Sequence, residues 1–293
     1  MTLPEEVRAH AAHVVEHARW VRIDHDRLAA LAPDGGVPEP QLDPERHFLD
    51  GDRDAVAAYL LTLTAVNFGS GWFPTLRKRA GMSGYFTVAS SLADRFRASG
   101  PWSAEQLRAL TTDEVAGVLG QARDHELMGL YAQALRQLGV FLGERTALGL
   151  IDEARGSSER LARLVAGGMA MFNDVGFFKR AQILSSDLAL GGVATFGDLD
   201  ALTIFADNLV PHVLRCDGVL VYDPALAAHV DAERLLTHAA QEREIRAAAV
   251  HACRQLAERL QAPERVIDMW LWNRGQDPEY KARPRHRARS VFY

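Results

Sequence analysis

The sequence is poor in cysteine and in net positive charge, and each shortage excludes a class of protein. Only Cys216 and Cys253 are present, at no spacing typical of a metal site and behind no basic and apolar leader. We therefore expect a cytoplasmic protein without a structural disulfide. The formal net charge is -5 and the pI is about 6.1. This balance argues against a protein that grips the phosphate backbone of a nucleic-acid duplex, while a small anionic ligand remains possible.

Long apolar runs and strand-like segments are also scarce. The longest apolar runs, such as residues 55–66, are interrupted by threonine. They fall short of the roughly 20 apolar residues that span a bilayer, so no membrane partner is expected. With 48% apolar and 24% charged residues in 293, the chain has ample material for the core of a globular protein of one large or two medium domains.

Helical patterns fill most of the chain. Apolar residues recur with helical spacing across residues 4–30, helical pattern resumes near Arg53, and residues 233–260 and 263–272 are again helical. Ser103 and either Thr111 or Thr112 have the sequence context of helix caps. The best strand is residues 218–222, and Phe177-Phe178 is a weaker one. The pattern predicts a mainly α protein with few short strands.

Three histidines of the first helical stretch invite a metal interpretation. His10, His13 and His17 are three and four residues apart, and Glu6 extends the stripe. A solvated helix face is the favoured interpretation, because ligands along one helix do not by themselves close a tetrahedral shell. We expect neither a metal nor a cofactor.

The loop at residues 67–74 sets two glycines among three aromatic residues. It predicts either a flat apolar surface that approaches a ligand closely or a loop buried in the core, with equal weight.

One acid lies inside an apolar run. Asp207 follows Ile204 and Phe205 and precedes Leu209 and Val210. A carboxylate in such surroundings is costly to desolvate unless it is paired, so Asp207 needs a structural partner or a chemical task. A buried arginine such as Arg180 or Arg246 would be the structural partner.

The order of elements around this acid is similar to that of the helix-hairpin-helix DNA glycosylases. We expect a helix, a glycine hairpin at Gly191-Gly192, a turn at Gly197-Asp198, and a second helix that carries Phe205, Asp207 and Pro211. In those enzymes an acid shortly after the hairpin helps to cleave an N-glycosidic bond.

A wider set of motifs is more specific. The set comprises Asn67-Phe68, Ser83-Gly84-Tyr85, residues 178–184 (FKRAQIL), Phe205-Ala206-Asp207, residues 242–246 (EREIR), residues 268–272 (DMWLW) and residues 286–293 (HRARSVFY). From about His47 to the last residue this set resembles the queuosine salvage family, whose members are queuosine 5'-phosphate N-glycosidases that release the base queuine. The resemblance implies a multi-helical fold related to the helix-hairpin-helix DNA glycosylases. It implies one domain, residues 1–293, with a possible subdivision into a helical part, residues 1–165, and a helix-hairpin-helix-like part with a C-terminal tail, residues 166–293.

The resemblance also implies a site that binds a free nucleotide rather than duplex nucleic acid. Asp207 matches the active-site acid of the family. The expected substrate-binding residues are His47, Phe205, Asp268, Trp272, Asn273 and Lys179. Lys179, Arg287 and Arg289 are candidate ligands of the 5'-phosphate. Related chains carry aromatic or acidic residues where this chain has Asn208 and Asn273.

The chemistry of the implied reaction assigns roles to these groups. Cleavage of a ribosyl C1'–N9 bond builds positive charge on the sugar, which an ionised Asp207 beside C1' would stabilise. The 7-deazaguanine base has carbon in place of N7, so hydrogen bonds around the ring must meet the charge of the departing base. Asp268 is suited to accept from the N1–H and NH2 groups of the guanine edge, with Trp272 stacked on the ring and Trp270 turned into the core.

Two other classes of function remain open. A DNA-repair glycosylase that acts on a flipped base would need salt-sensitive duplex binding, which the charge balance disfavours. A non-catalytic protein that binds queuine or queuosine would show binding without turnover. Residues 242–246 are interpreted as an ion-paired helix rather than a metal site.

Overall fold

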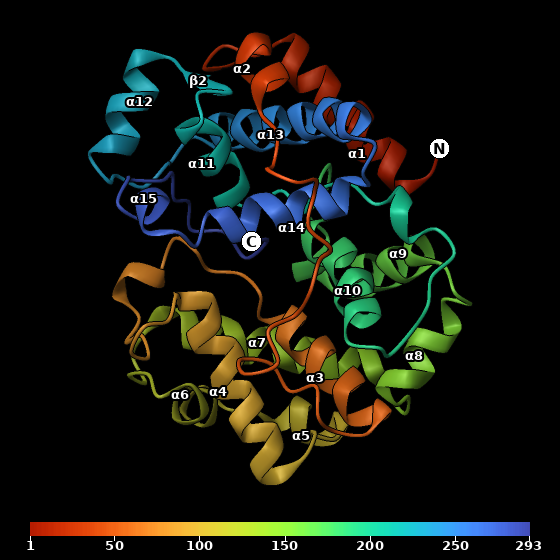
Figure 1. The fold of residues 1–293 in the computed structure, drawn as a ribbon. Coiled ribbons are helices and arrows are strands. Elements are labelled where there is room, and N and C mark those ends of the chain that lie inside the picture. Colours follow the sequence, from red (N-terminus) through yellow and green to blue (C-terminus); the bar gives the residue numbers. More distant parts are fainter. The chain divides into compact units, whose positions relative to one another are not determined.

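Helices make up nearly all the regular structure of the computed structural model, which describes residues 1–293 (Figure 1). The α-helices are α1 (Leu3–Glu16), α2 (His25–Ala30), α3 (Arg53–Ala65), α4 (Gly84–Ser99), α5 (Ala104–Ala109), α6 (Thr112–Leu119), α7 (Glu126–Leu142), α8 (Ala147–Glu153), α9 (Ser158–Gly168), α10 (Lys179–Leu190), α11 (Leu209–Cys216), α12 (Pro224–Asp231), α13 (Ala239–Leu260), α14 (Glu264–Arg274) and α15 (Pro278–Lys281). The 3-10 helices are η1 (Phe73–Thr75), η2 (Ala170–Phe172) and η3 (Leu199–Ala201), and the strands are β1 (Val21–Ile23) and β2 (Leu220–Tyr222). The prediction of a mainly α protein with few short strands is confirmed. No helix combines the length and the apolar character that a bilayer crossing requires.

The chain forms two units, each with its own core. The first unit contains residues 1–40, 175–179 and 200–289, and the second contains residues 41–174, 180–199 and 290–293. The chain therefore passes from one unit to the other several times, once within the first turn of α10. Of the predicted site residues, His47 alone belongs to the second unit. The others belong to the first unit: Lys179, Phe205, Asp207, Asp268, Trp272, Asn273, Arg287 and Arg289.

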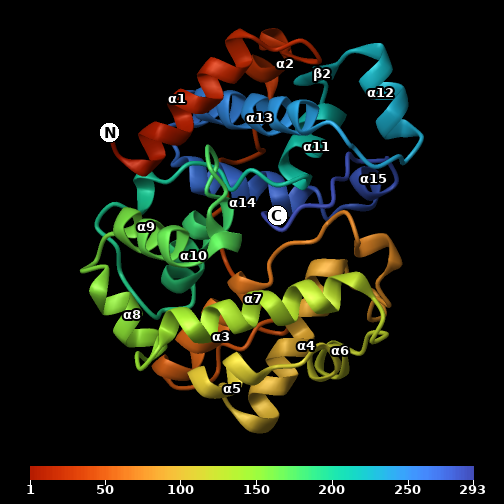
Figure 2. The same cartoon turned by 180° about the vertical axis from the view of Figure 1, so that it is seen from behind.

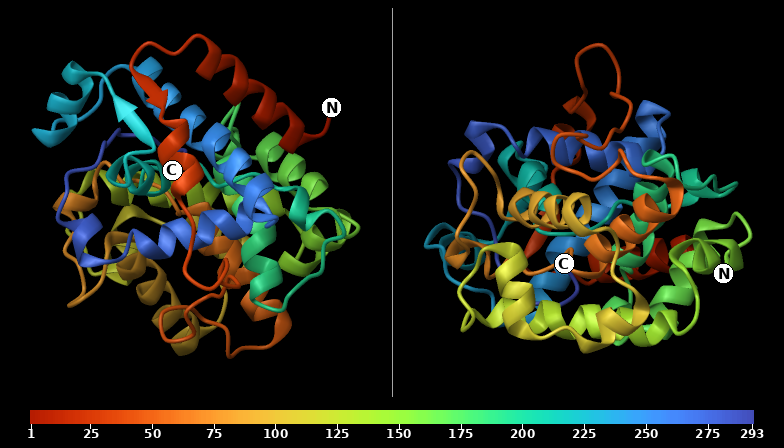
Figure 3. Two further views of the ribbon diagram at one scale, coloured as in Figure 1. Left: turned by 45° about the horizontal axis from the view of Figure 1, so that its top comes forward. Right: turned by 90° about the horizontal axis from the view of Figure 1, so that it is seen from below.

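The long helix α13 is the centre of the first unit. Helix α1 packs along it, and α11 and α14 also contact it, as Figure 1 shows. The two strands form an antiparallel pair in which Val21 lies opposite Tyr222, visible as a red and a teal arrow in Figure 3 (left). Gly275 follows α14 where that helix meets α11, and a Cβ there would lie 2.8 Å from the side chain of Leu209.

The N-terminal stretch departs from the prediction of one helix over residues 4–30. Helix α1 ends at Glu16, and the chain continues into β1 and then α2. The carboxylate of Glu244 accepts hydrogen bonds from the backbone amides of Arg19 and Trp20 at 2.8–3.0 Å. These amides would otherwise extend the helix, so a tertiary contact from α13 stops it and allows β1 to pair with β2.

The two strand predictions have opposite outcomes. The predicted strand at 218–222 is confirmed as β2. The prediction of a strand at Phe177-Phe178 is wrong, because these residues lie in a turn where Gly176 has φ +91° and Phe178 has φ +51°. Positive φ values are incompatible with an extended strand.

The second unit is a cluster of helices around α3 and α7. Figure 2 shows α7 running across this unit, where it contacts α3, α5 and α6. The predicted caps are confirmed, since Ser103 and Thr111 each form a reciprocal capping box with the residue three positions on. The loop at 67–74 is a core loop at Phe68 and Trp72, which are buried.

Arg180 holds the second unit together from inside. The guanidinium is buried between Phe68 and Phe172, with its Cζ 4.8 Å and 4.5 Å from the two ring centroids. It donates to the carbonyls of Ala65 (2.5 Å), Val291 (2.7 Å) and Met171. One side chain thereby joins the end of α3, η2 and the C-terminal residues.

Candidate active site

The segment at residues 202–207 brings a carboxylate to the start of α11. Residues 202–206 are buried and have no regular secondary structure. Asp207 is half-buried, and its Oδ1 accepts hydrogen bonds from the backbone N–H groups of Leu209 (2.7 Å) and Val210 (3.2 Å). These are two of the N–H groups that the first turn of a helix leaves without a partner. Both bonds end on Oδ1, so Oδ2 is available to a ligand.

The prediction that Phe205 and Asp207 lie within a helix is wrong. Helix α11 begins at Leu209, and only Pro211 of the three named residues belongs to it. A side chain that accepts from the first turn has to precede that turn, and the uninterrupted burial of residues 202–206 leaves no exposed helix face.

Asp207 is not neutralised by either of the arginines considered as structural partners. Arg246 donates from Nε to the carbonyl of Ala206 at 2.9 Å, and its Nη1 pairs with Glu242 at 3.3 Å. It therefore holds the peptide before Asp207 rather than the carboxylate. Arg180 is engaged by carbonyls of the second unit. The ion-paired helix predicted for residues 242–246 is confirmed by the Glu242–Arg246 pair.

Asp268 is linked directly to the same segment. It is buried on α14, and its Oδ1 accepts from the backbone N–H of Phe205 at 2.8 Å. A carboxylate accepts hydrogen bonds at about four positions, and the Phe205 N–H occupies one of them. The bond fixes Asp268 of α14 beside the chain two residues before Asp207.

The aromatic residues of α14 separate as their spacing predicts. Trp270 is buried, which confirms its place in the core, and Trp272 is half-buried. Trp272 lies four residues after Asp268 and therefore on the same side of the helix. Asn273 is exposed.

A tight turn sets the position of Lys179. Lys179 is buried and is the first residue of α10. In the preceding turn, the ring of Phe177 packs edge-on against His10 with centroids 5.3 Å apart, and the Cζ of Arg246 lies 4.0 Å from its centroid. A Cβ at Gly176 would come within 2.6 Å of the His10 ring, so only glycine allows this packing.

The C-terminal segment is attached to the residue that follows Asp207. The side-chain amide of Asn208 donates to the carbonyl of His286 at 3.2 Å. Arg287 pairs with Glu233 at 3.5 Å, and Arg289 is exposed. Arg285 was not among the predicted residues, although it interacts electrostatically with Asp207. The alternation of arginine at 283, 285, 287 and 289 was the signal that could have found it.

Two buried histidines, His286 of this segment and His212 of α11, are neutral. Burial lowers the pKa of His286 to about 3, and His212 and nearby arginines lower it further in the same direction. Burial likewise lowers the pKa of His212 to about 4, against a hydrogen bond to the carbonyl of Tyr280. Neither ring nitrogen of His286 has a hydrogen-bond partner.

In the second unit, His47 forms a hydrogen-bonded chain with Tyr85. Its Nδ1 lies 2.8 Å from the carbonyl of Asp43 and its Nε2 lies 3.0 Å from the Tyr85 hydroxyl. Because a carbonyl only accepts, Nδ1 carries the proton and Nε2 accepts from Tyr85. Burial lowers the pKa of His47, and burial with the nearby charge of Asp187 raises the pKa of Tyr85 well above its usual value.

The histidine stripe of α1 does not act as one set. His10 packs against Phe177, whereas His13, Glu16 and His17 are exposed and place one possible ligand atom each within 4.8 Å of one another. His17 donates from Nδ1 to the carbonyl of His13.

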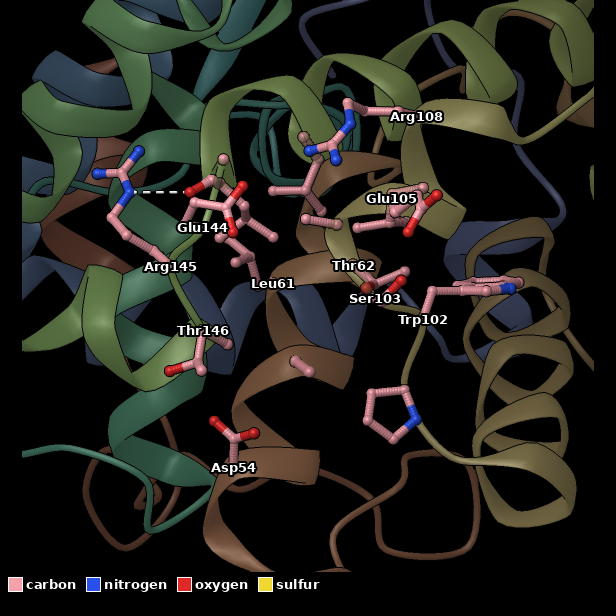
Figure 4. A pocket seen from close by; sticks show the side chains of 18 residues that line it. Asp54, Leu61, Thr62, Trp102, Ser103, Glu105, Arg108, Glu144, Arg145 and Thr146 are labelled. Carbon is pink, nitrogen blue, oxygen red and sulfur yellow. Dashed lines mark hydrogen bonds between the residues drawn. The ribbon is translucent and has the colours of Figure 1, made fainter.

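Two hollows contain none of the predicted site residues. One, of about 520 Å³, lies in the second unit and is lined by residues that include Asp54, Trp102, Glu105, Arg108 and Arg145 (Figure 4). The other lies in the first unit beside α1 and the C-terminal end of α13. Arg108 and Arg145 in the first hollow already donate to backbone carbonyls.

Together these features define a class of protein. It is a mainly helical protein that fixes one carboxylate by backbone amides, links a second buried acid to the same segment, and attaches an arginine-rich C-terminal segment beside them.

The chain belongs to the queuosine salvage protein family, whose profile matches residues 47–293. It is 36% identical to the queuosine 5'-phosphate N-glycosylase/hydrolase of Sphaerobacter thermophilus over 96% of this chain and 95% of that protein. It is 25% identical to the protein of the same name from Mus musculus over 99% of each chain. The Nematostella vectensis protein of that name is 29% identical over 64% of this chain and 65% of its own length. The predicted family is confirmed.

Proposed function

We propose that this protein hydrolyses the N-glycosidic bond of queuosine 5'-phosphate and so releases queuine for salvage. The observation that carries the proposal is the half-buried Asp207, held by two backbone amides through Oδ1 with Oδ2 available, in a chain of the queuosine salvage family. A carboxylate oriented in this way suits the stabilisation of positive charge on a sugar.

In the proposed reaction the C1'–N9 electron pair leaves with the base and the oxygen of water bonds to C1'. The base gains a proton and the water loses one, so the products are queuine and ribose 5-phosphate. Asp207 stabilises the cationic sugar. The carboxylate does not have to reorient when positive charge develops on the sugar, because the two amides already hold the side chain in place.

Asp268 and Trp272 are proposed to hold the base. The buried Asp268 accepts from the N1–H and NH2 groups of the guanine edge, and the half-buried Trp272 stacks on the ring. The bond from Phe205 N–H keeps Asp268 oriented while it does so. Phe205, Asn273 and Lys179 remain predicted substrate contacts, and Lys179, Arg287 and Arg289 remain predicted phosphate contacts.

His47 remains a predicted substrate contact. Both nitrogens are engaged, by the Asp43 carbonyl and the Tyr85 hydroxyl. The imidazole therefore keeps Tyr85 in one orientation.

We further propose that the fold is related to the helix-hairpin-helix DNA glycosylases and that residues 166–293 form the related part of one domain. The order of elements along the chain supports this: α10 ends at Leu190, Gly191 and Gly192 follow, and Asp207 lies two residues before α11. A cytoplasmic location is proposed with it, in keeping with the free thiols of Cys216 and Cys253.

The first prediction tests the catalytic role of Asp207. Asp207→Asn preserves an oxygen for the two backbone amides but removes the negative charge, so hydrolysis of queuosine 5'-phosphate should fall at least about 100-fold with little loss of stability. Free queuine is measured by chromatography, and unfolding by circular dichroism.

Asp200→Asn is the matched control. Asp200 is an exposed acid of the same unit, paired with Arg265 at 2.6 Å, and this variant should keep the activity of the parent chain. Full activity in Asp207→Asn would overturn the mechanism. Tight queuine binding without turnover in the parent chain would instead identify a binding protein, and salt-sensitive duplex binding a DNA glycosylase.

A further inference from the structure

The segment that follows α15 carries arginine at every second position, at 283, 285, 287 and 289. It has no regular secondary structure from residue 284 to residue 290. Its burial alternates around His286, which is buried while Arg285 and Arg287 on either side are half-buried. The His286 side chain is therefore enclosed by the protein, whereas Arg285 and Arg287 are partly open to solvent.

Backbone contacts hold this segment beside the candidate catalytic acid. The carbonyl of His286 accepts from Asn208 at 3.2 Å, and the carbonyl of Arg287 accepts from the N–H of Leu236 at 2.8 Å. Asn208 is the neighbour of Asp207, and His286 is the neighbour of Arg285. This hydrogen bond therefore brings the backbone at residue 285 close to the backbone at residue 207.

Arg285 differs from the other arginines of the segment in having no partner in the protein. Arg283 donates to the carbonyl of Cys216 at 3.1 Å, and Arg287 pairs with Glu233 at 3.5 Å. Arg289 is exposed. Arg285 makes no hydrogen bond or ion pair, although a half-buried guanidinium with five N–H donors gains free energy from an acceptor.

The charges that face Arg285 favour an added anion. Burial lowers the pKa of Arg285, the charge of Asp207 raises it, and the charge of Arg287 lowers it again. His212 and His286, which also face it, are neutral at pH 7 because burial lowers their pKa values to about 4 and about 3. Asp207 is thus the one carboxylate that interacts electrostatically with Arg285, without a direct ion pair, and Arg287, which is paired with Glu233, adds positive charge beside it.

We infer that Arg285 binds the 5'-phosphate of the substrate and makes the site prefer a nucleotide to a nucleoside. A guanidinium donates two parallel hydrogen bonds to a phosphate, and this match sets arginine apart from lysine. Asp207 would then meet the sugar of the same nucleotide at C1' while Arg285 meets its phosphate. This inference rests on the proposed function, because it assigns the substrate's phosphate to a residue of the same site.

The test compares Arg285→Met with Arg283→Met. Both variants remove one positive charge from the same segment, but only the first removes the side chain without a protein partner. For Arg285→Met we expect kcat/KM for queuosine 5'-phosphate to fall about 10- to 100-fold, chiefly through KM, while kcat/KM for the nucleoside queuosine stays within about threefold. Arg283→Met should leave both values near those of the parent chain.

Two results would overturn the inference. An equal loss on nucleotide and nucleoside in kcat would show that Arg285 only supports the charge of Asp207. An unchanged ratio of the two kcat/KM values would show that it does not contact the phosphate. Arg285→Lys, which keeps the charge but not the paired geometry, should recover part of the lost nucleotide activity.

Calorimetric titration with inorganic phosphate supplies a readout that does not depend on turnover. We expect the parent chain and Arg283→Met to bind phosphate and Arg285→Met to lose most of that affinity, with unfolding midpoints confirming that each variant is folded. Equal phosphate binding in all three chains would reject the role of Arg285. A parent chain that binds phosphate at Arg285 but hydrolyses neither substrate would contradict the proposed function and leave this assignment intact.

Discussion

At the scale of single residues, the candidate site depends on which oxygen of each acid the protein already uses. Oδ1 of Asp207 accepts from the amides of Leu209 and Val210. Oδ1 of Asp268 accepts from the amide of Phe205. Backbone amides fix the orientation of a carboxylate without adding a full opposite charge. Both acids are therefore oriented by the fold.

A second prediction separates the structural and binding roles of Asp268. Asp268→Asn keeps an oxygen acceptor for Phe205 N–H, but its NH2 group would face the donors of the guanine edge. We expect kcat/KM to fall by about 10- to 100-fold while the unfolding midpoint changes little. Steady-state kinetics and thermal unfolding measure the two effects.

Asp268→Ala provides the comparison, because it also leaves the buried amide of Phe205 without its acceptor. This variant should lose both activity and stability, the latter by about 1–3 kcal/mol. Equal activity in the parent chain and Asp268→Asn would remove Asp268 from the base-binding site.

At the scale of the elements, helix ends position the functional groups. Helix α11 starts at Leu209 because Asp207 accepts from its first turn, and α14 meets α11 closely at Gly275. The close approach at Gly275 needs a residue without a Cβ, although its φ of -63° is open to any residue. Here the requirement for glycine is one of space rather than of backbone conformation.

The third prediction concerns this approach of α14 to α11. Gly275→Ala places a methyl group 2.8 Å from the side chain of Leu209, so Leu209 must shift and stability should fall by about 1–3 kcal/mol. Urea unfolding followed by circular dichroism measures the change.

Gly117→Ala is the matched control in another helix. Gly117 lies inside α6, and a Cβ there would meet nothing within 4 Å. The same substitution should therefore stabilise the protein, by about 0.5–1 kcal/mol. Opposite signs for the two variants confirm that packing decides the outcome, and destabilisation below 0.5 kcal/mol in Gly275→Ala would contradict the packing argument.

At the scale of the whole molecule, burial of neutral histidines links stability to pH. His212 and His286 are buried, and burial lowers their pKa values to about 4 and about 3. The unfolded chain binds a proton at each histidine below its ordinary pKa of about 6.5, whereas the folded chain does not. Stability is therefore lost as the pH falls below about 6.5, and the loss continues to about pH 4 or 3.

The fourth prediction follows from this linkage. Between pH 7 and pH 5 each of these histidines should cost about 2 kcal/mol of unfolding free energy, from about 1.4 kcal/mol per pH unit below 6.5. Urea unfolding at the two pH values measures the loss. His286→Leu removes a ring whose nitrogens have no partners, so it should keep stability at pH 7 and reduce the acid-induced loss by about half.

A pH dependence unchanged by His286→Leu would contradict the burial of a neutral imidazole at this position. The unfolding free energies of the parent chain and the variant at pH 7 show whether leucine fits at this position. The backbone carbonyl of residue 286 still accepts from Asn208 in the variant, so that hydrogen bond does not enter the comparison.

The sequence by itself determined the mainly α class, the caps at Ser103 and Thr111, the strand at 218–222, the burial of Trp270 and the family, because helical spacing, cap chemistry and ordered motifs are local properties of the chain. Only the tertiary structure decided where the first helix stops, since Glu244 accepts from backbone amides 224 and 225 positions away along the chain, which no local pattern identifies. It also decided that Arg180 and Arg246 serve carbonyls while Arg285 has no protein partner. Pairing depends on which groups folding brings together, and the side-chain amide of Asn208 has its partner, the carbonyl of His286, 78 positions away along the chain.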